Sequence, residues 1–157
     1  LQYHFGSKDD LIAATINERT TQIDKVRLEM IESFPDKPTM RNIYEALVYP
    51  LRDLIKDGAA GKNYLSFLAQ TMTHPNWDLR KIIIEHDIKG MAECYTMLDQ
   101  MLPDTTEEER LMRQNAAFFV TILTFKRWCM ARPKPKMNLE DTTQFIITSS
   151  LSIIQQA

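Results

Sequence analysis

Few residues in this chain could do chemistry, and their spacing alone does not assemble a catalytic or metal site. His86 follows Glu85 and precedes Asp87, and Glu93 lies two helical turns further on, on the same face as His86. Two turns is too far for a compact metal or acid–base site unless another element contributes a ligand. We therefore expect no metal ion here and interpret His86 as a core or interface histidine.

The other chemical signatures are also weak. Cys94 and Cys129 are far apart, with no C-x-x-C motif and no histidines at ligand spacing, so the sequence indicates neither a zinc site nor a disulfide framework. No G-x-S-x-G, Walker or Rossmann motif occurs, no signal peptide is visible, and no apolar run approaches the roughly 20 residues of a membrane helix. These features favour a cytoplasmic protein without a cofactor or a membrane partner, and leave an enzyme as a minor hypothesis.

Composition indicates one folded domain. The chain has 157 residues, of which 44% are hydrophobic and 25% charged, and its 19 Lys and Arg against 21 Asp and Glu give a net charge of -2. This balance excludes overall disorder and a polybasic nucleic-acid binder, so any contact with DNA must involve a small part of the chain. Only four Gly and seven Pro are present. Turns should therefore be scarce, which favours an all-helical fold.

Apolar residues recur at helical spacing in six segments separated by proline, glycine or capping residues. The predicted helices cover residues 9–34, 39–57, about 62–73, 79–103, 106–129 and 139–154. Thr106 with Glu109 forms a capping-box pair, and Asn138 is expected to cap the last helix.

Two residues inside these helices need an explanation. Pro50 removes one backbone donor and collides with the carbonyl of Ala46, but the apolar phase continues across it, so we expect a kink rather than two helices. Gly90 costs its helix about 1 kcal/mol relative to Ala. We expect the close approach of another helix or of a ligand to compensate for it.

The first eleven residues carry a specific pattern. Tyr3, His4 and Phe5 are followed by a small residue, a Ser-Lys pair, two acidic residues and Leu11. This segment resembles the end of the helix-turn-helix of TetR-family transcriptional repressors. The resemblance implies that Tyr3, His4 and Lys8 contact DNA phosphates, beside the free amides of the helix that follows. The alternative is a capped helix start after an aromatic turn, with no role in DNA binding.

The same resemblance implies a domain organisation. Residues 1–8 would end a helix-turn-helix DNA-binding domain, and residues 9–157 would form an all-helical domain of about six helices that binds an effector and dimerises. Roughly the first 40 residues of such a protein, with its base-reading side chains, are absent from this chain. We therefore expect operator DNA to be bound only when that region is present.

The middle helices carry the candidates for an effector pocket. The effector is expected to be small and largely hydrophobic or aromatic, with Arg80, Glu85 or Arg127 able to orient a polar group. The alternative is that the aromatic and methionine side chains are only core. The candidates are Tyr64, Phe67, Met72, Met91, Tyr95, Phe118 and Trp128.

The last two helices are the candidates for a homodimer interface, because they combine small residues with bulky ones. The alternative is that these residues pack only within one subunit. The candidates are Ala116, Phe119, Phe145, Ser149, Ser152 and Ile153.

Together these features predict a regulator, most simply a repressor, that a small molecule releases from operator DNA. The effector binds the non-DNA-binding arrangement of the protein more tightly than the DNA-binding one, and the ratio of these two affinities sets how far it lowers operator affinity. The operator must lower the affinity for the effector by the same factor. The helix that begins after Ser7 is the expected lever. The alternative function is a helical scaffold or small-molecule carrier without a DNA role.

Overall fold

The structure, a computed structural model, describes residues 8–156, apart from the side chains of residues 8–10, 12 and 13. This part of the chain contains seven helices and no strand. The all-helical prediction is therefore confirmed, with one helix more than expected. The helices are α1 Lys8–Glu32, α2 Met40–Lys56, α3 Ala59–Thr71, α4 Leu79–Glu85, α5 Lys89–Gln100, α6 Glu107–Met130 and α7 Leu139–Ile154.

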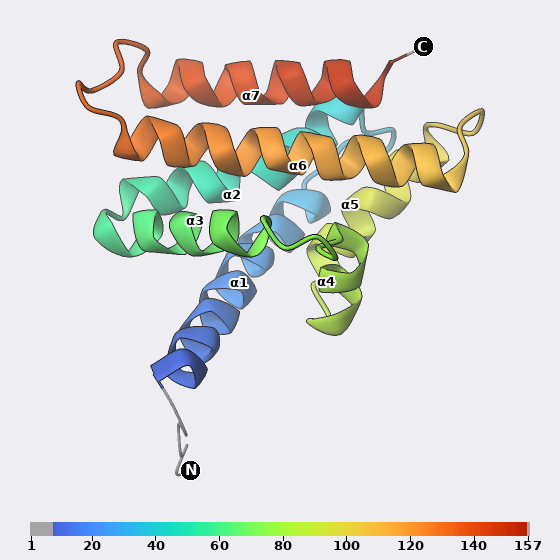
Figure 1. The fold of residues 1–157 in the computed structure, drawn as a ribbon. Coiled ribbons are helices and arrows are strands. Elements are labelled where there is room, and N and C mark those ends of the chain that lie inside the picture. The colour runs from blue at the N-terminus through green and yellow to red at the C-terminus, as the bar shows by residue number, and fades with distance from the viewer. Residues whose placement is uncertain (1–7, 157) are drawn as a thin grey trace.

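The helices pack into a bundle, with α6 and α7 as an outer layer on one side. Helices α6 and α7 lie side by side along one side of the molecule, and α2 and α3 pack beneath them (Figure 1). Helix α1 contacts α2 and α5 through its C-terminal half, and its N-terminal half projects away from the α6–α7 layer (Figure 1). No described helix has both the length and the apolar composition needed to cross a membrane.

Several helices begin where local side chains satisfy the first free amides. Thr39 with Asn42 and Thr106 with Glu109 form capping boxes at α2 and α6. Asn138 accepts a hydrogen bond from the amide of Asp141 at 2.7 Å and so caps α7. The predictions at α6 and α7 are confirmed, because a cap depends only on residues close in sequence.

The predicted single helix over 79–103 is wrong. The chain breaks between α4 and α5, where Asp87 takes a left-handed conformation with φ of 50°. The amide of Ile88 donates to the carbonyl of Ile83 at 3.0 Å and that of Asp87 to Ile84 at 3.3 Å, which is the Schellman pattern of a helix end. Glycine usually marks this position, so an aspartate there gave no sequence signal.

Helix α2 is continuous through Pro50, which confirms the prediction of one helix rather than two, while the kink stays a prediction. The proline has no N–H for the carbonyl of Ala46. The guanidinium of Arg27, on α1, donates to that carbonyl through Nε at 3.0 Å, and its second nitrogen donates to Leu47 O at 3.3 Å. A buried side chain from another helix thus occupies the acceptor that the proline leaves free.

The expected close approach at Gly90 is confirmed. A Cβ at this position would lie 2.7 Å from a carboxylate oxygen of Asp24 on α1. That carboxylate accepts hydrogen bonds from the amides of Gly90 at 2.8 Å and Met91 at 3.1 Å. Ile88 provides no side-chain cap for α5. Asp24 therefore caps α5 from a distant part of the sequence.

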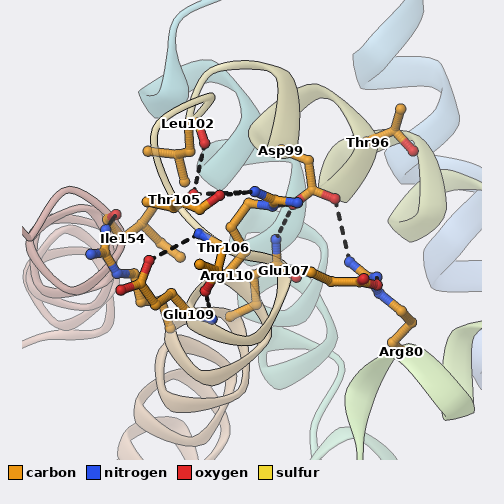
Figure 2. A network of polar contacts seen from close by, with 12 residues as sticks. Arg80, Thr96, Asp99, Leu102, Thr105, Thr106, Glu107, Glu109, Arg110 and Ile154 are labelled. Carbon is orange, nitrogen blue, oxygen red and sulfur yellow. Dashed lines mark hydrogen bonds and ion pairs between the residues drawn. The ribbon is translucent and has the colours of Figure 1, made fainter.

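A polar network centred on Asp99 holds α4, α5 and α6 together (Figure 2). Its carboxylate lies 3.3 Å from a guanidinium nitrogen of Arg80 and 3.2 Å from Arg110 Nε, and it accepts from Gln114 at 2.9 Å. Arg80 also pairs with Glu107 at 2.6 Å. These contacts fix the end of the bundle to which the short helix α4 is attached.

Candidate functional site

An apolar cavity of about 280 Å³ lies between α1 and the helices it faces. Isoleucine, leucine, methionine and aromatic side chains make most of its wall, and a few polar groups are placed among them. The lining residues are Ile16, Asn17, Thr20, Ile23, Arg27, Leu51, Tyr64, Phe67, Leu68, Thr71, Met72, Trp77, Leu79, Ile82, His86, Ile88, Met91 and Phe118.

Helix α1 provides one long face of this cavity. Ile16, Thr20, Ile23 and Arg27 all line it, and their separations of four, three and four residues place them on one side of a helix. The wall therefore follows α1 along several turns. Movement of α1 relative to the facing helices would therefore change the volume of the cavity.

Aromatic side chains close the opposite wall. Trp77, in the segment before α4, stacks on Phe118 of α6 with ring centroids 5.6 Å apart and an interplanar angle of 17°. Tyr64 of α3 shares a hydrogen bond with Thr20 of α1 at 2.8 Å. Burial raises the pKa of Tyr64, so its phenol remains protonated near neutral pH.

The charges beside the cavity are already paired. The Arg27 guanidinium lies 2.9 Å from the Asp24 carboxylate, and both side chains are almost completely buried. Arg27 also donates to two carbonyls of α2, and Asp24 also accepts from two amides of α5. The pair leaves no net charge for an anionic ligand, so the cavity favours a neutral molecule.

Five of the seven candidate pocket residues meet at this cavity. They are Tyr64, Phe67, Met72, Met91 and Phe118. Tyr95 does not line it and instead borders a small hollow deeper in the bundle and a separate space beside α4. Trp128 lies elsewhere, near the end of α6, where its indole donates to Met137 O at 2.8 Å.

The charged candidates lie outside the cavity. Arg80 belongs to the Asp99 network, and Glu85 and Arg127 are exposed. His86 is exposed as well, so its interpretation as a core histidine is wrong. It ends α4 at the edge of the cavity, beside a surface groove formed by α1 and the α4–α5 turn.

Sequence reasoning missed the contribution of α1 and of Trp77. The spacing of Ile16 and Ile23 was evident, but it indicated only one buried face. Whether such a face meets a filled core or a cavity depends on how closely the facing helices pack, which no local pattern encodes.

Of the candidate dimer residues, some are exposed, some are half-buried and one packs inside its own subunit. Phe145 is 54% exposed, Ser152 is also exposed, and Ala116, Ser149 and Ile153 are half-buried. Phe119 turns toward its own subunit, with its ring 5.1 Å from that of Trp77. Two exposed apolar residues of α6 were not among the predicted interface residues.

Leu123 and Met112 of α6 are 50% and 68% exposed, respectively. With Ala116 and Val120 they follow helical spacing and form a second apolar stripe on α6. Phe145 is exposed on α7, the helix that packs against α6. We call the exposed residues Met112, Leu123 and Phe145, with Ala116 and Val120, the α6–α7 face. The spacing of this stripe was a usable signal in the sequence.

Two of the three candidate DNA-contacting residues, Tyr3 and His4, lie outside the residues that the structure describes. Lys8 begins α1, but its side chain is not among those described. Their role as phosphate contacts therefore stays a prediction.

Comparison with known protein families gives a match. The family described as "Tetracyclin repressor-like, C-terminal domain" matches residues 45–146, from within α2 to within α7. No curated protein and no solved structure matches the chain. The match covers well over half of the chain and includes the helices that face α1 across the cavity. The chain therefore belongs to the tetracyclin repressor-like (TetR) C-terminal domain family, whose fold is typical of TetR-family regulators.

Proposed function

We propose that this chain is the effector-binding and dimerisation part of a cytoplasmic DNA-binding regulator, most simply a repressor. The observation that carries the proposal is that α1 forms one wall of an apolar cavity and also leads to residues 1–8, which we assign to the end of a helix-turn-helix domain. A ligand in this cavity would therefore act on the helix connected to the DNA-binding part.

The effector is a small, neutral and mostly apolar or aromatic molecule. Its volume is limited by the cavity of about 280 Å³. Tyr64, Phe67, Met72, Met91 and Phe118 are proposed contacts, together with Ile16, Ile23 and Trp77. Tyr95 borders the small hollow beside the cavity rather than the cavity itself, and Trp128 is not proposed as a contact with the effector.

The α6–α7 face is proposed as the homodimer interface. Three large apolar side chains are exposed on it, and two long helices from each subunit would form a four-helix bundle about a twofold axis. The two copies of α1 would then sit at a fixed separation, which sets the spacing of the two DNA-binding parts.

The mechanism is a coupling of two equilibria. A ligand that fits the cavity better in one arrangement of α1 shifts the dimer toward that arrangement and lowers operator affinity by the ratio of its two affinities. By linkage, operator DNA lowers the affinity for the ligand by the same factor. The Asp24–Arg27 pair connects α1 to α2 and α5, so movement of α1 is transmitted to two other cavity walls.

The test uses the protein with its native N-terminal region restored and DNA flanking its own gene, at two salt concentrations, with residues 1–157 alone as control. We expect tight, salt-sensitive binding by the long form only. Binding of an apolar dye without any DNA binding by the long form would favour the alternative, a small-molecule carrier or scaffold.

A further inference from the structure

Tyr44 carries a buried hydroxyl that has no hydrogen-bond partner. The residue lies on α2, is 2% exposed, and its hydroxyl oxygen is one of only three buried side-chain polar atoms left without a partner in the described residues. Of the other two, Arg110 Nε faces the Asp99 carboxylate at 3.2 Å, and Ser150 lies in the core of α7. A buried hydroxyl without a partner loses its bonds to water and gains nothing in return, so it needs an explanation.

A small hollow adjoins the apolar cavity at this residue. It has a volume of about 20 Å³, and it is lined by Tyr44, Tyr95 and Thr121 together with residues of α2. The hollow lies directly beside the cavity, because four residues line both spaces: Arg27, Leu51, Met91 and Phe118. A space of this size holds about one water molecule, or one oxygen atom of a ligand.

The groups around the hollow determine what it can accept. Burial raises the pKa of Tyr44 well above its usual value, and Tyr95 and Cys94 raise it further, so the phenol keeps its proton and donates it. The Thr121 hydroxyl already donates to Ala117 O at 2.8 Å. Arg27 is paired with Asp24, so its charge does not favour an anion here.

We propose that Tyr44 is a specificity-determining residue of the cavity, whose hydroxyl donates a hydrogen bond to a single neutral oxygen, such as a carbonyl oxygen, at the inner end of an otherwise apolar ligand. This inference rests on the proposed function of the cavity and narrows its ligand class. Aromatic ketones and related neutral oxygen compounds fit, whereas hydrocarbons leave the hydroxyl without a partner and carboxylates add an unpaired charge.

The experiment is a double-mutant cycle between the protein hydroxyl and the ligand oxygen. The full-length protein is loaded with the neutral fluorescent dye N-phenylnaphthylamine, which is then displaced by methyl naphthyl ketone or by isopropenylnaphthalene, in which a CH2 group replaces the carbonyl oxygen. The variants are Tyr44→Phe and, as control, Tyr49→Phe. Tyr49 is on the same helix, but its hydroxyl accepts from Gln144 at 3.1 Å and does not line the cavity.

We expect the wild-type protein and Tyr49→Phe to prefer the ketone, and Tyr44→Phe to lose about five- to tenfold of that preference. The thermal unfolding midpoint of Tyr44→Phe should be equal to or above that of the wild type, because the substitution removes a hydroxyl without a partner and keeps the ring.

Two outcomes would overturn the inference while leaving the cavity intact. One is dye binding by Tyr44→Phe with an unlowered unfolding midpoint and an unchanged preference, which would mean that the hydroxyl does not meet the ligand. The other is a lowered unfolding midpoint with unchanged preference, which would mean that the hydroxyl is satisfied by a water molecule only. Failure of the wild-type protein to bind the dye at all would instead reject the cavity as a ligand site, and this inference with it.

Discussion

One carboxylate, that of Asp24, joins three helices of this protein. It pairs with Arg27 on its own helix, caps α5 through the amides of Gly90 and Met91, and holds the guanidinium that occupies the free carbonyl of Ala46 in α2. Removing one member of a buried pair leaves the other charge without compensation. The cost then exceeds what the pair itself contributes to stability.

We expect Asp24→Asn to lower the free energy of unfolding by about 3–5 kcal/mol, because Arg27 stays buried without a counter-ion. Denaturant unfolding followed by circular dichroism measures the change. The double variant Asp24→Asn with Arg27→Met removes the uncompensated charge and keeps an acceptor for the α5 amides, so it should lose less than Asp24→Asn alone. Lys89→Met, which removes an exposed contact of 4.0 Å with Asp87, should leave stability unchanged. A double variant less stable than Asp24→Asn would contradict this account.

Both cysteines are buried, but in different surroundings. Burial raises the pKa of the Cys94 thiol to about 12, and it also raises that of Cys129, where Lys62 acts in the opposite direction. The thiolate is the nucleophile. At pH 8 we therefore expect iodoacetamide to label Cys129 before Cys94 in the native protein, and both at similar rates in denaturant, as measured by peptide mass spectrometry. Faster labelling of Cys94 in the native state would be inconsistent with its burial.

Among the helices, α5 depends on a contact that its own sequence does not provide. Alanine is the better helix former, by about 1 kcal/mol. At position 90, however, its Cβ would lie 2.7 Å from the Asp24 carboxylate and 3.2 Å from the Asp24 carbonyl oxygen. Steric conflict with a buried carboxylate outweighs the gain in propensity.

We expect Gly90→Ala to lower the free energy of unfolding by about 1–3 kcal/mol despite its higher propensity. The matched control is Ala92→Gly, at an exposed position of the same helix, which should lose only about 1 kcal/mol from propensity. Denaturant unfolding of the two variants checks the comparison. A stabilised Gly90→Ala variant would mean that α1 does not press on α5 as described.

Helices α1 and α2 are joined by the hydrogen bond from Arg27 to the carbonyl of Ala46, which Pro50 leaves free. In Pro50→Ala the new amide can donate to Ala46 O, so it competes with Arg27 for that acceptor beside the cavity. We expect the affinity for N-phenylnaphthylamine to fall several-fold, as measured by fluorescence titration. Pro103→Ala, in the exposed turn before α6, serves as the control and should leave the affinity unchanged. Equal affinity in both variants would separate Pro50 from the cavity.

At the scale of the whole molecule, the α6–α7 face is an apolar surface on the outer layer of the bundle. Single exposed apolar residues are common on proteins, but a stripe along one helix, with an exposed aromatic ring on the neighbouring helix, is typical of an interface. In the full-length protein we expect Phe145→Glu combined with Leu123→Glu to convert a dimer to a monomer in sedimentation velocity experiments. Ile84→Glu, at a 73% exposed position on α4, should leave the dimer intact. A dimer that survives the double substitution would place the interface elsewhere.

Much of this architecture was predictable because it depends on neighbours in sequence. Capping residues such as Thr106 and Asn138, and the apolar phase that continues through Pro50, act within a few residues and were read correctly. The break at Asp87 was missed because a left-handed helix end usually carries glycine, and an aspartate there looks like any exposed helical residue.

The sequence by itself determined the helical class, most helix boundaries and the family, since periodicity, caps and a local motif encode them. Five of the seven pocket candidates also reached one cavity, because aromatic and methionine residues on the middle helices face inward. Only the tertiary structure decided that α1 forms one wall of the cavity, that Asp24 caps α5, and that Tyr44 borders a small hollow beside the cavity. Each of these joins residues far apart in the chain, and their meeting depends on how whole helices pack.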